Sequence, residues 1–90
     1  MSSFEVPLES RKKYLTRRLA ELDQLEESRD VELAKRVGHQ IKGNAATFLF
    51  PTLAELGSRL EQAAIVKDDT LIKKLTADIK VMVQQLLTEL

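Results

Sequence analysis

The chain has 90 residues, of which 43% are hydrophobic and 31% are charged, and its 14 basic and 14 acidic residues give a net charge of zero. This length predicts one small domain with a single core, and this composition is not that of a disordered or fibrous chain. Nucleic-acid binding is not indicated, because the basic residues are intermixed with acidic ones.

The absence of cysteine excludes a disulfide framework and a thiolate metal site. The N-terminus lacks a charged segment followed by an apolar core, and no apolar run approaches the roughly 20 residues of a membrane span. We therefore expect a cytoplasmic protein that does not associate with membranes.

The first third of the chain has apolar residues every three or four positions, which predicts a helix over residues 7–27. Pro7 suits the first turn of this helix. We interpret the basic residues around it as a solvated face: Arg11, Lys12, Lys13, Arg17 and Arg18.

A second helix is predicted over residues 30–49. Asp30 can cap its start, and Pro51 disfavours helical geometry at the preceding residue. One continuous apolar stripe marks its buried face: Ala34, Val37, Ile41, Ala45 and Phe48.

Two further helices are predicted over residues 52–66 and 69–89. Thr52 and Glu55 have the spacing of a capping box, and Asp68 or Asp69 can cap the last helix. Four amphipathic helices with short connections predict an all-α fold, an antiparallel up-down-up-down four-helix bundle.

The only histidine, His39, lies in the middle of the second predicted helix. At about 100° per residue it falls about 160° from Ile41, the centre of the apolar stripe, and is therefore expected to face solvent. Lys42, Gly43 and Ala46 fall on the same outer half of the helix.

Gly43 is unfavourable inside a helix by about 1 kcal/mol relative to alanine, so its presence needs a reason. A side chain there would stand against the His39 ring, and glycine leaves room for another macromolecule. Lys42 supplies a positive charge for phosphoryl oxygens, and an exposed imidazole is largely neutral and nucleophilic near pH 7. These properties predict a phosphoryl acceptor.

The segment HQIKGNAA, from His39 to Ala46, resembles the H-x-L-K-G-S/A-A signature of histidine-containing phosphotransfer (HPt) domains. The resemblance covers residues 30–69 by motif and the whole chain by length and helix pattern. Residues outside the segment contribute to it: Asp30, Leu33-Ala34, Leu53, Leu56, Leu60-Glu61 and Ala63-Ala64. One departure is Leu49, which stands where such domains commonly have a turn glycine.

The resemblance implies a four-helix bundle whose histidine carries phosphate between receiver-domain aspartates in a multistep phosphorelay. We therefore predict a phosphocarrier in which His39, through Nε2, accepts a phosphoryl group from one receiver domain and passes it to another. The chain has no P-loop, so the donor must be a partner and the protein is not an enzyme with its own ATP site. The expected partners are response-regulator receiver domains, which bring the Mg²⁺, and a hybrid histidine kinase.

We expect a monomer with no cofactor of its own. One histidine without cysteine lacks the usual metal ligand set. The sequence also lacks the nucleophile elbow that would indicate a hydrolase. The alternative function is a helical adaptor that binds a signalling partner through the same face without phosphorylation. The combination of His39, Lys42 and Gly43 argues against it, since an adaptor has no need of these three residues together.

Four further residues are candidates for partner binding. Lys35 and Arg36 lie one turn before His39, at the edge of the expected contact surface. Their positive charges could attract the acidic pocket of a receiver domain. Ala46 belongs to a flat surface on which the partner would bind. Gln40 could hydrogen-bond to the phosphoryl group or to water. Gly38 and Gly57 lie nearer the apolar stripes, where we expect them to permit close contact between helices.

Overall fold

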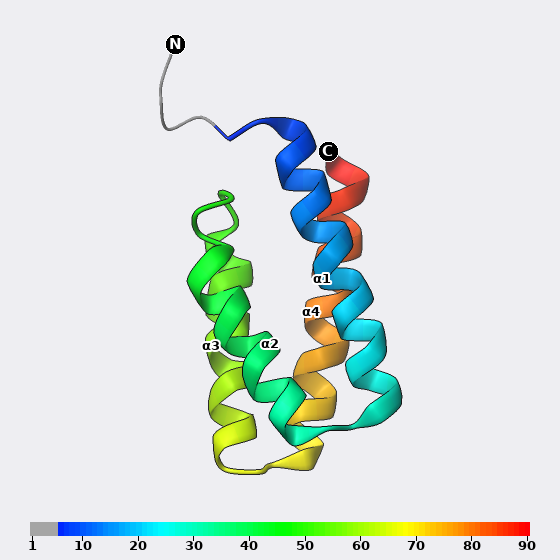
Figure 1. Cartoon of the computed structure of the whole chain (residues 1–90), viewed down its shortest axis with the longest axis vertical. Coiled ribbons are helices and arrows are strands. Elements are labelled where there is room, and N and C mark those ends of the chain that lie inside the picture. The colour runs from blue at the N-terminus through cyan, green and yellow to red at the C-terminus, as the bar shows by residue number, and fades with distance from the viewer. Residues whose placement is uncertain (1–5) are drawn as a thin grey trace.

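The computed structural model describes residues 6–90 and contains four helices in this part of the chain: α1 (Leu8–Ser28), α2 (Val31–Asn44), α3 (Pro51–Ile65) and α4 (Asp69–Glu89). Successive helices run in opposite directions, and both ends of the described chain lie at the same end of the molecule (Figure 1). The predicted all-α four-helix fold is confirmed. Residues 1–5, where no targeting signal is expected, lie outside the described residues.

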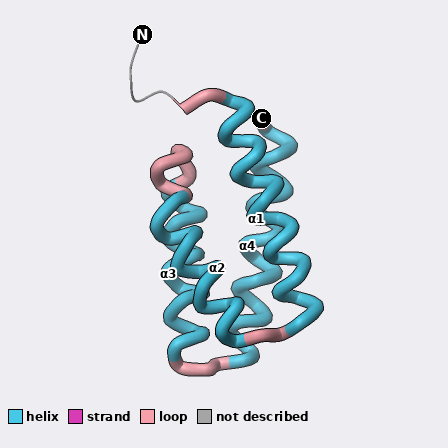
Figure 2. The backbone as a smooth tube through the Cα atoms, in the orientation of Figure 1, coloured by secondary structure: helices cyan, strands magenta, loops and turns pink. Residues whose placement is uncertain are grey.

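The helices associate as two pairs, joined by short loops (Figure 2). The contact of α2 with α3 is the most extensive, followed by those of α1 with α4 and α3 with α4, while α1 touches α2 only sparsely. Figure 1 shows the α2–α3 pair beside the α1–α4 pair. The helix that carries His39 is therefore positioned mainly by α3.

Apolar side chains from all four helices meet along the axis of the bundle. The predicted stripe of α2 is buried at Ala34, Val37, Ile41 and Ala45, while Phe48 is half-buried. The largest fully buried aliphatic side chains of the other helices are Leu15, Leu22, Leu53, Leu60, Ile79 and Val83. This burial fixes the rotation of α2 about its own axis, and with it the direction of its outer face.

The second helix ends earlier than predicted, at Asn44 and not at residue 49. Phe48 N–H contacts the carbonyls of both Asn44 and Ala45, so the last turn tightens before the chain reverses. The Phe50 N–H then donates to the Ala45 oxygen at 2.8 Å and the Leu49 N–H to the Ala46 oxygen at 3.0 Å. This is the hydrogen bonding of a Schellman turn, in which Leu49, with φ of 71°, occupies the left-handed position that glycine favours.

The start of α3 also differs from the prediction. Its first residue is Pro51, whose fixed φ suits the first position of a helix, and Phe50 is the N-cap without a side-chain cap. Thr52 therefore lies within the helix, and Glu55 pairs with Arg59 at 3.3 Å. The N-caps of α2 and α4 are aspartates: Asp30 accepts from the backbone of Glu32 and Leu33, and Asp68 from that of Leu71.

Two of the five basic residues on α1 are not fully exposed, since Arg11 is half-buried and Arg18 is buried, which corrects the prediction of a solvated face. The Arg11 Nε donates to the Phe48 oxygen at 3.2 Å, and its guanidinium lies 4.9 Å from the centre of the Phe50 ring. Arg18 is buried, 2.8 Å from the Glu21 carboxylate and 5.2 Å from the centre of the Tyr14 ring.

Tyr14 in turn stacks on Phe48 with ring centroids 4.4 Å apart. Burial raises the pKa of Tyr14 to about 12, so its hydroxyl is neutral at physiological pH. Aromatic stacking and Arg11 thus attach α1 to the turn between α2 and α3, although α1 makes few contacts with α2 itself.

The left-handed backbone at Leu49 leads to a stability prediction. A left-handed residue with a Cβ costs about 1–2 kcal/mol, and the Leu49 side chain recovers little because the residue is 52% exposed. We expect Leu49→Gly to leave the free energy of unfolding unchanged or to raise it by up to about 1 kcal/mol. The β-branched control Leu49→Val should lower it, and urea unfolding followed by circular dichroism measures both. Equal losses in the two variants would contradict the assignment of strain to Leu49.

Candidate functional site

His39 lies in the middle of α2 with 70% of its side chain exposed. The prediction that the ring faces solvent is therefore confirmed. One edge of the ring is held, because Nδ1 lies 2.8 Å from Oε2 of Glu61 on α3. Among residues 6–90 this is the one hydrogen bond of the imidazole, which leaves Nε2 on the open side.

Glu61 is shared between two side chains of α2. Its Oε2 contacts His39, and its Oε1 accepts a hydrogen bond from the Lys42 Nζ at 3.3 Å. The Glu61 side chain is only 11% exposed, whereas that of Lys42 is 51% exposed. A buried carboxylate thus connects the exposed imidazole and the exposed ammonium.

The charge of Glu61 follows from these contacts. Burial disfavours the ionised carboxylate, but hydrogen bonds from His39 and Lys42 outweigh burial and hold the pKa of Glu61 below its ordinary value. Glu61 is therefore ionised at neutral pH and can only accept hydrogen bonds. The neutral imidazole must then carry its proton on Nδ1, so the lone pair is on the solvent-facing Nε2.

Close packing of α2 on α3 brings Glu61 to this position. A Cβ atom at Gly38 would lie 2.5 Å from the backbone nitrogen of Glu61, and one at Gly57 would lie 2.6 Å from Cγ2 of Ile41. Such distances are too short for real contacts, so both positions require glycine. The prediction that Gly38 and Gly57 permit close helix contact is confirmed.

Gly43 has different surroundings from Gly38. A Cβ atom placed there would find none of the described atoms of neighbouring side chains or helices within 4 Å, the His39 ring included. The expectation that any side chain at Gly43 would stand against the ring is therefore wrong for a methyl group. Only a longer side chain could reach the space beside His39, and the approach to the ring is open.

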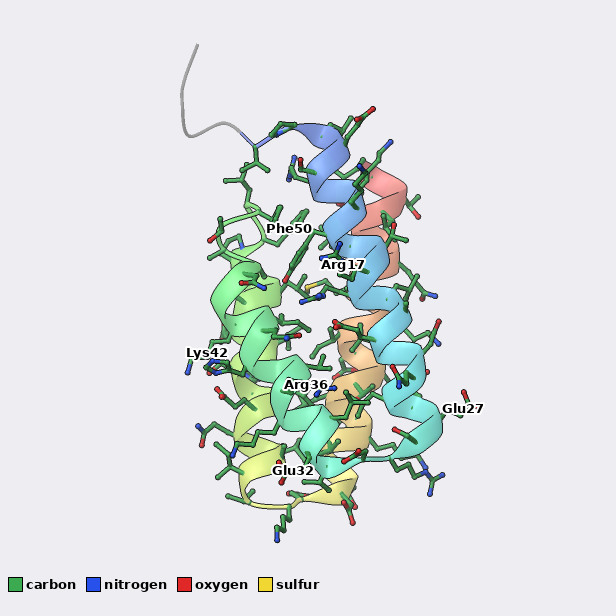
Figure 3. All side chains as sticks on the ribbon, in the orientation of Figure 1. Arg17, Glu27, Glu32, Arg36, Lys42 and Phe50 are labelled. Carbon is green, nitrogen blue, oxygen red and sulfur yellow. The ribbon has the colours of Figure 1, made fainter. Side chains whose placement is uncertain are left out.

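The other predicted site residues flank this group. Lys35 and Arg36 are exposed on α2, and Ala46 is exposed in the turn that follows this helix. Figure 3 shows Lys42 at the outer side of the α2–α3 pair and Arg36 on the side of α2 toward α1. Gln40 differs from them, because its Oε1 is shielded from solvent and has no partner in residues 6–90.

Glu61 was not predicted as a site residue, although a signal for it exists in the sequence. It follows Leu60 and lies one turn after Gly57, so a carboxylate interrupts the otherwise apolar buried stripe of α3. A buried charge requires a partner. The identity of that partner could not be read from the sequence, because it depends on the register of α2 against α3.

Within residues 6–90 no group of three or more histidine, cysteine, aspartate or glutamate side chains could hold a metal ion. None of the helices described is long and apolar enough to cross a bilayer.

Replacing each of the two glycines of α2, which lie on either side of His39, by alanine should change the free energy of unfolding in opposite directions. Gly43→Ala should raise the free energy of unfolding by up to about 1 kcal/mol, since it removes the propensity cost without a clash. Gly38→Ala should lower it by about 1–3 kcal/mol, because the new methyl group overlaps the backbone of α3. Thermal or urea unfolding of both variants measures the difference, and a loss of stability in Gly43→Ala would contradict the open space described at that position.

Acidification should weaken the contribution of Glu61 to the free energy of unfolding. Because the pKa of Glu61 is lower in the folded chain than its ordinary value of 4.5, its ionised form stabilises the fold. That contribution is present above pH 4.5 and is lost as the pH falls through the folded-state pKa. The stability difference between the wild type and Glu61→Gln, measured by urea unfolding, should therefore shrink on acidification below this value. Glu55→Gln, on the exposed side of the same helix, serves as the control, and a difference that grows with acid would contradict the sign.

Comparison with known proteins points to one family. The family model described as "Hpt domain" matches residues 12–89, which is most of the chain. No curated protein sequence and no solved structure gives a significant match.

Proposed function

Because the chain belongs to the Hpt domain family, whose members carry phosphoryl groups on histidine in two-component phosphorelays, we propose that His39 is the phosphorylated residue of this chain. The observation that carries the proposal is the orientation of its ring. The imidazole is 70% exposed, and its Nδ1 is engaged by Glu61, which leaves the nucleophilic Nε2 accessible to a partner.

The reaction begins with an aspartyl phosphate on a receiver domain. The Nε2 lone pair forms a bond to phosphorus, and the bond from phosphorus to the aspartyl oxygen breaks, with its electrons remaining on the aspartate. A second receiver aspartate later attacks the phosphorus and leaves the lone pair on Nε2 again. The chain is an intermediate carrier, and its phosphoryl donor is a protein partner.

Lys42 supports both steps by neutralising charge. Its ammonium is half-exposed and binds the same carboxylate as the His39 ring, which keeps it close to the ring that would carry the phosphoryl group. Phosphoryl transfer depends mainly on positioning and on stabilising negative charge. Gly43 contributes by leaving the approach to the ring open.

The partners are receiver domains, including that of a hybrid histidine kinase, and the Mg²⁺ of the reaction belongs to the receiver. Lys35 and Arg36 place positive charge beside His39, which steers an acidic receiver pocket toward the ring. Ala46 extends the flat surface beyond Gly43. We expect a weak, transient contact made by a monomeric cytoplasmic protein that holds no cofactor of its own.

Phosphotransfer from a labelled receiver domain tests the proposal. The wild-type protein should acquire an acid-labile, alkali-stable phosphoryl group, and His39→Gln should acquire none, because the nucleophile is removed. Circular dichroism should show the same helical content in both proteins, since the His39 side chain is mostly outside the core. Label that persists in His39→Gln would rule out this site, and an unlabelled wild type against all receivers of the organism would rule out the function.

A further inference from the structure

The Glu61 carboxylate lies against the ring nitrogen that does not react. Its Oε2 is 2.8 Å from Nδ1, and the side chain is 11% exposed, so water competes little for this contact. The hydrogen bond fixes the proton on Nδ1 before transfer.

Phosphorylation of Nε2 changes the charge of the imidazole ring. A neutral imidazole that uses its Nε2 lone pair to bond phosphorus becomes a cation if Nδ1 keeps its proton. Without a nearby anion, this proton would be released to solvent at neutral or alkaline pH. A carboxylate in contact with Nδ1–H stabilises the cationic ring, because an opposite charge at this distance favours the charged form.

We propose that Glu61 holds the Nδ1 proton of His39 through the whole transfer cycle, so that the phosphoryl group arrives and leaves without proton uptake or release by the ring. This inference rests on the proposed function of His39. The consequence for donation is large. A ring that is protonated at Nδ1 leaves phosphorus as neutral imidazole, whereas a deprotonated ring would have to leave as an imidazolate anion, a far poorer leaving group.

Lys42 makes this arrangement compatible with a buried carboxylate. Before transfer, Lys42 and the Nδ1–H group both bind Glu61. After transfer, the phosphoryl oxygens attract Lys42, and the cationic ring replaces it as the positive partner of Glu61. The carboxylate therefore faces a positive or hydrogen-bonding group in both states. Glu61 acts through His39 and is a positioning residue, since it does not touch the phosphoryl group.

The other charged side chains of the described chain do not duplicate this role. On α2, Lys35 and Arg36 are cations one turn before His39. On α3, Glu55 pairs with Arg59. On α4, Lys74 pairs with Asp78 and Lys80 with Asp23 and Glu26 of α1. In residues 6–90, Glu61 is thus the carboxylate paired with the imidazole.

Nitrogen NMR of the phosphorylated protein tests the proposal directly. The wild type, Glu61→Gln and Glu55→Gln are labelled with ¹⁵N in histidine, and phosphoramidate phosphorylates the exposed imidazole without any receiver domain. The pH at which the phosphorylated ring loses its Nδ1 proton is then read from the ¹⁵N shifts between pH 6 and 9. Glu61→Gln should lower this pH by about one unit or more, whereas Glu55→Gln should leave it unchanged.

The second readout is the donation of the phosphoryl group to a receiver domain. The rate of donation is measured for Glu61→Gln and for the wild type at each pH, and the ratio of the variant to the wild type should fall as the pH rises. Above the pH at which the phosphorylated ring of Glu61→Gln loses its Nδ1 proton, this ratio should fall by up to about tenfold per pH unit. Equal midpoints and a rate ratio that does not vary with pH would overturn the proposal. Chemical phosphorylation separates the two hypotheses, because the ring can be titrated even if no receiver transfers phosphate to His39.

Discussion

The backbone contact between α2 and α3 is the constraint on which the site depends. Gly38 lies against the Glu61 backbone, and Gly57 against Ile41, at distances that leave no room for a side chain. This contact fixes both the separation and the register of the two helices, and thereby places the Glu61 carboxylate within hydrogen-bond distance of the His39 ring. A hydrogen bond weakens steeply with distance and angle, so a looser helix pair would leave a buried carboxylate facing an imidazole that it could not hold.

Of the two hydrogen-bonded side chains, Glu61 is largely buried and His39 is largely exposed. Glu61 is shielded, so its hydrogen bonds are little screened by water, while His39 projects far enough for its second nitrogen to meet another protein. A shielded carboxylate without partners would be strongly destabilising. Lys42 and His39 supply these partners, and their hydrogen bonds hold the pKa of Glu61 below its usual value in spite of burial. The same three residues therefore stabilise the fold locally and leave Nε2 of His39 open to solvent.

The sequence predicted the parts of the structure that depend on local periodicity. The apolar stripe of α2 determined which way the helix faces, and the exposure of His39 followed from counting residues along it. The pairing of His39 with Glu61 could not be predicted in this way, because the residues are 22 positions apart and meet only through the register of two helices. The contact of Arg11 with the Phe50 ring was missed for the same reason. Leu49 was recognised as unusual, but the sequence could not tell that the turn keeps the backbone of a glycine.

The two glycines around His39 show how one helix serves a buried and an exposed surface. Gly38 is required by what lies inside the protein, since the α3 backbone occupies the space of its missing side chain. Gly43 has no such neighbour, so the fold itself gives no reason for a residue of low helix propensity there. With two glycines in 14 residues, α2 has little intrinsic stability as an isolated helix. Its packing on α3 must stabilise it, and that packing leaves the outer face free to carry an accessible imidazole.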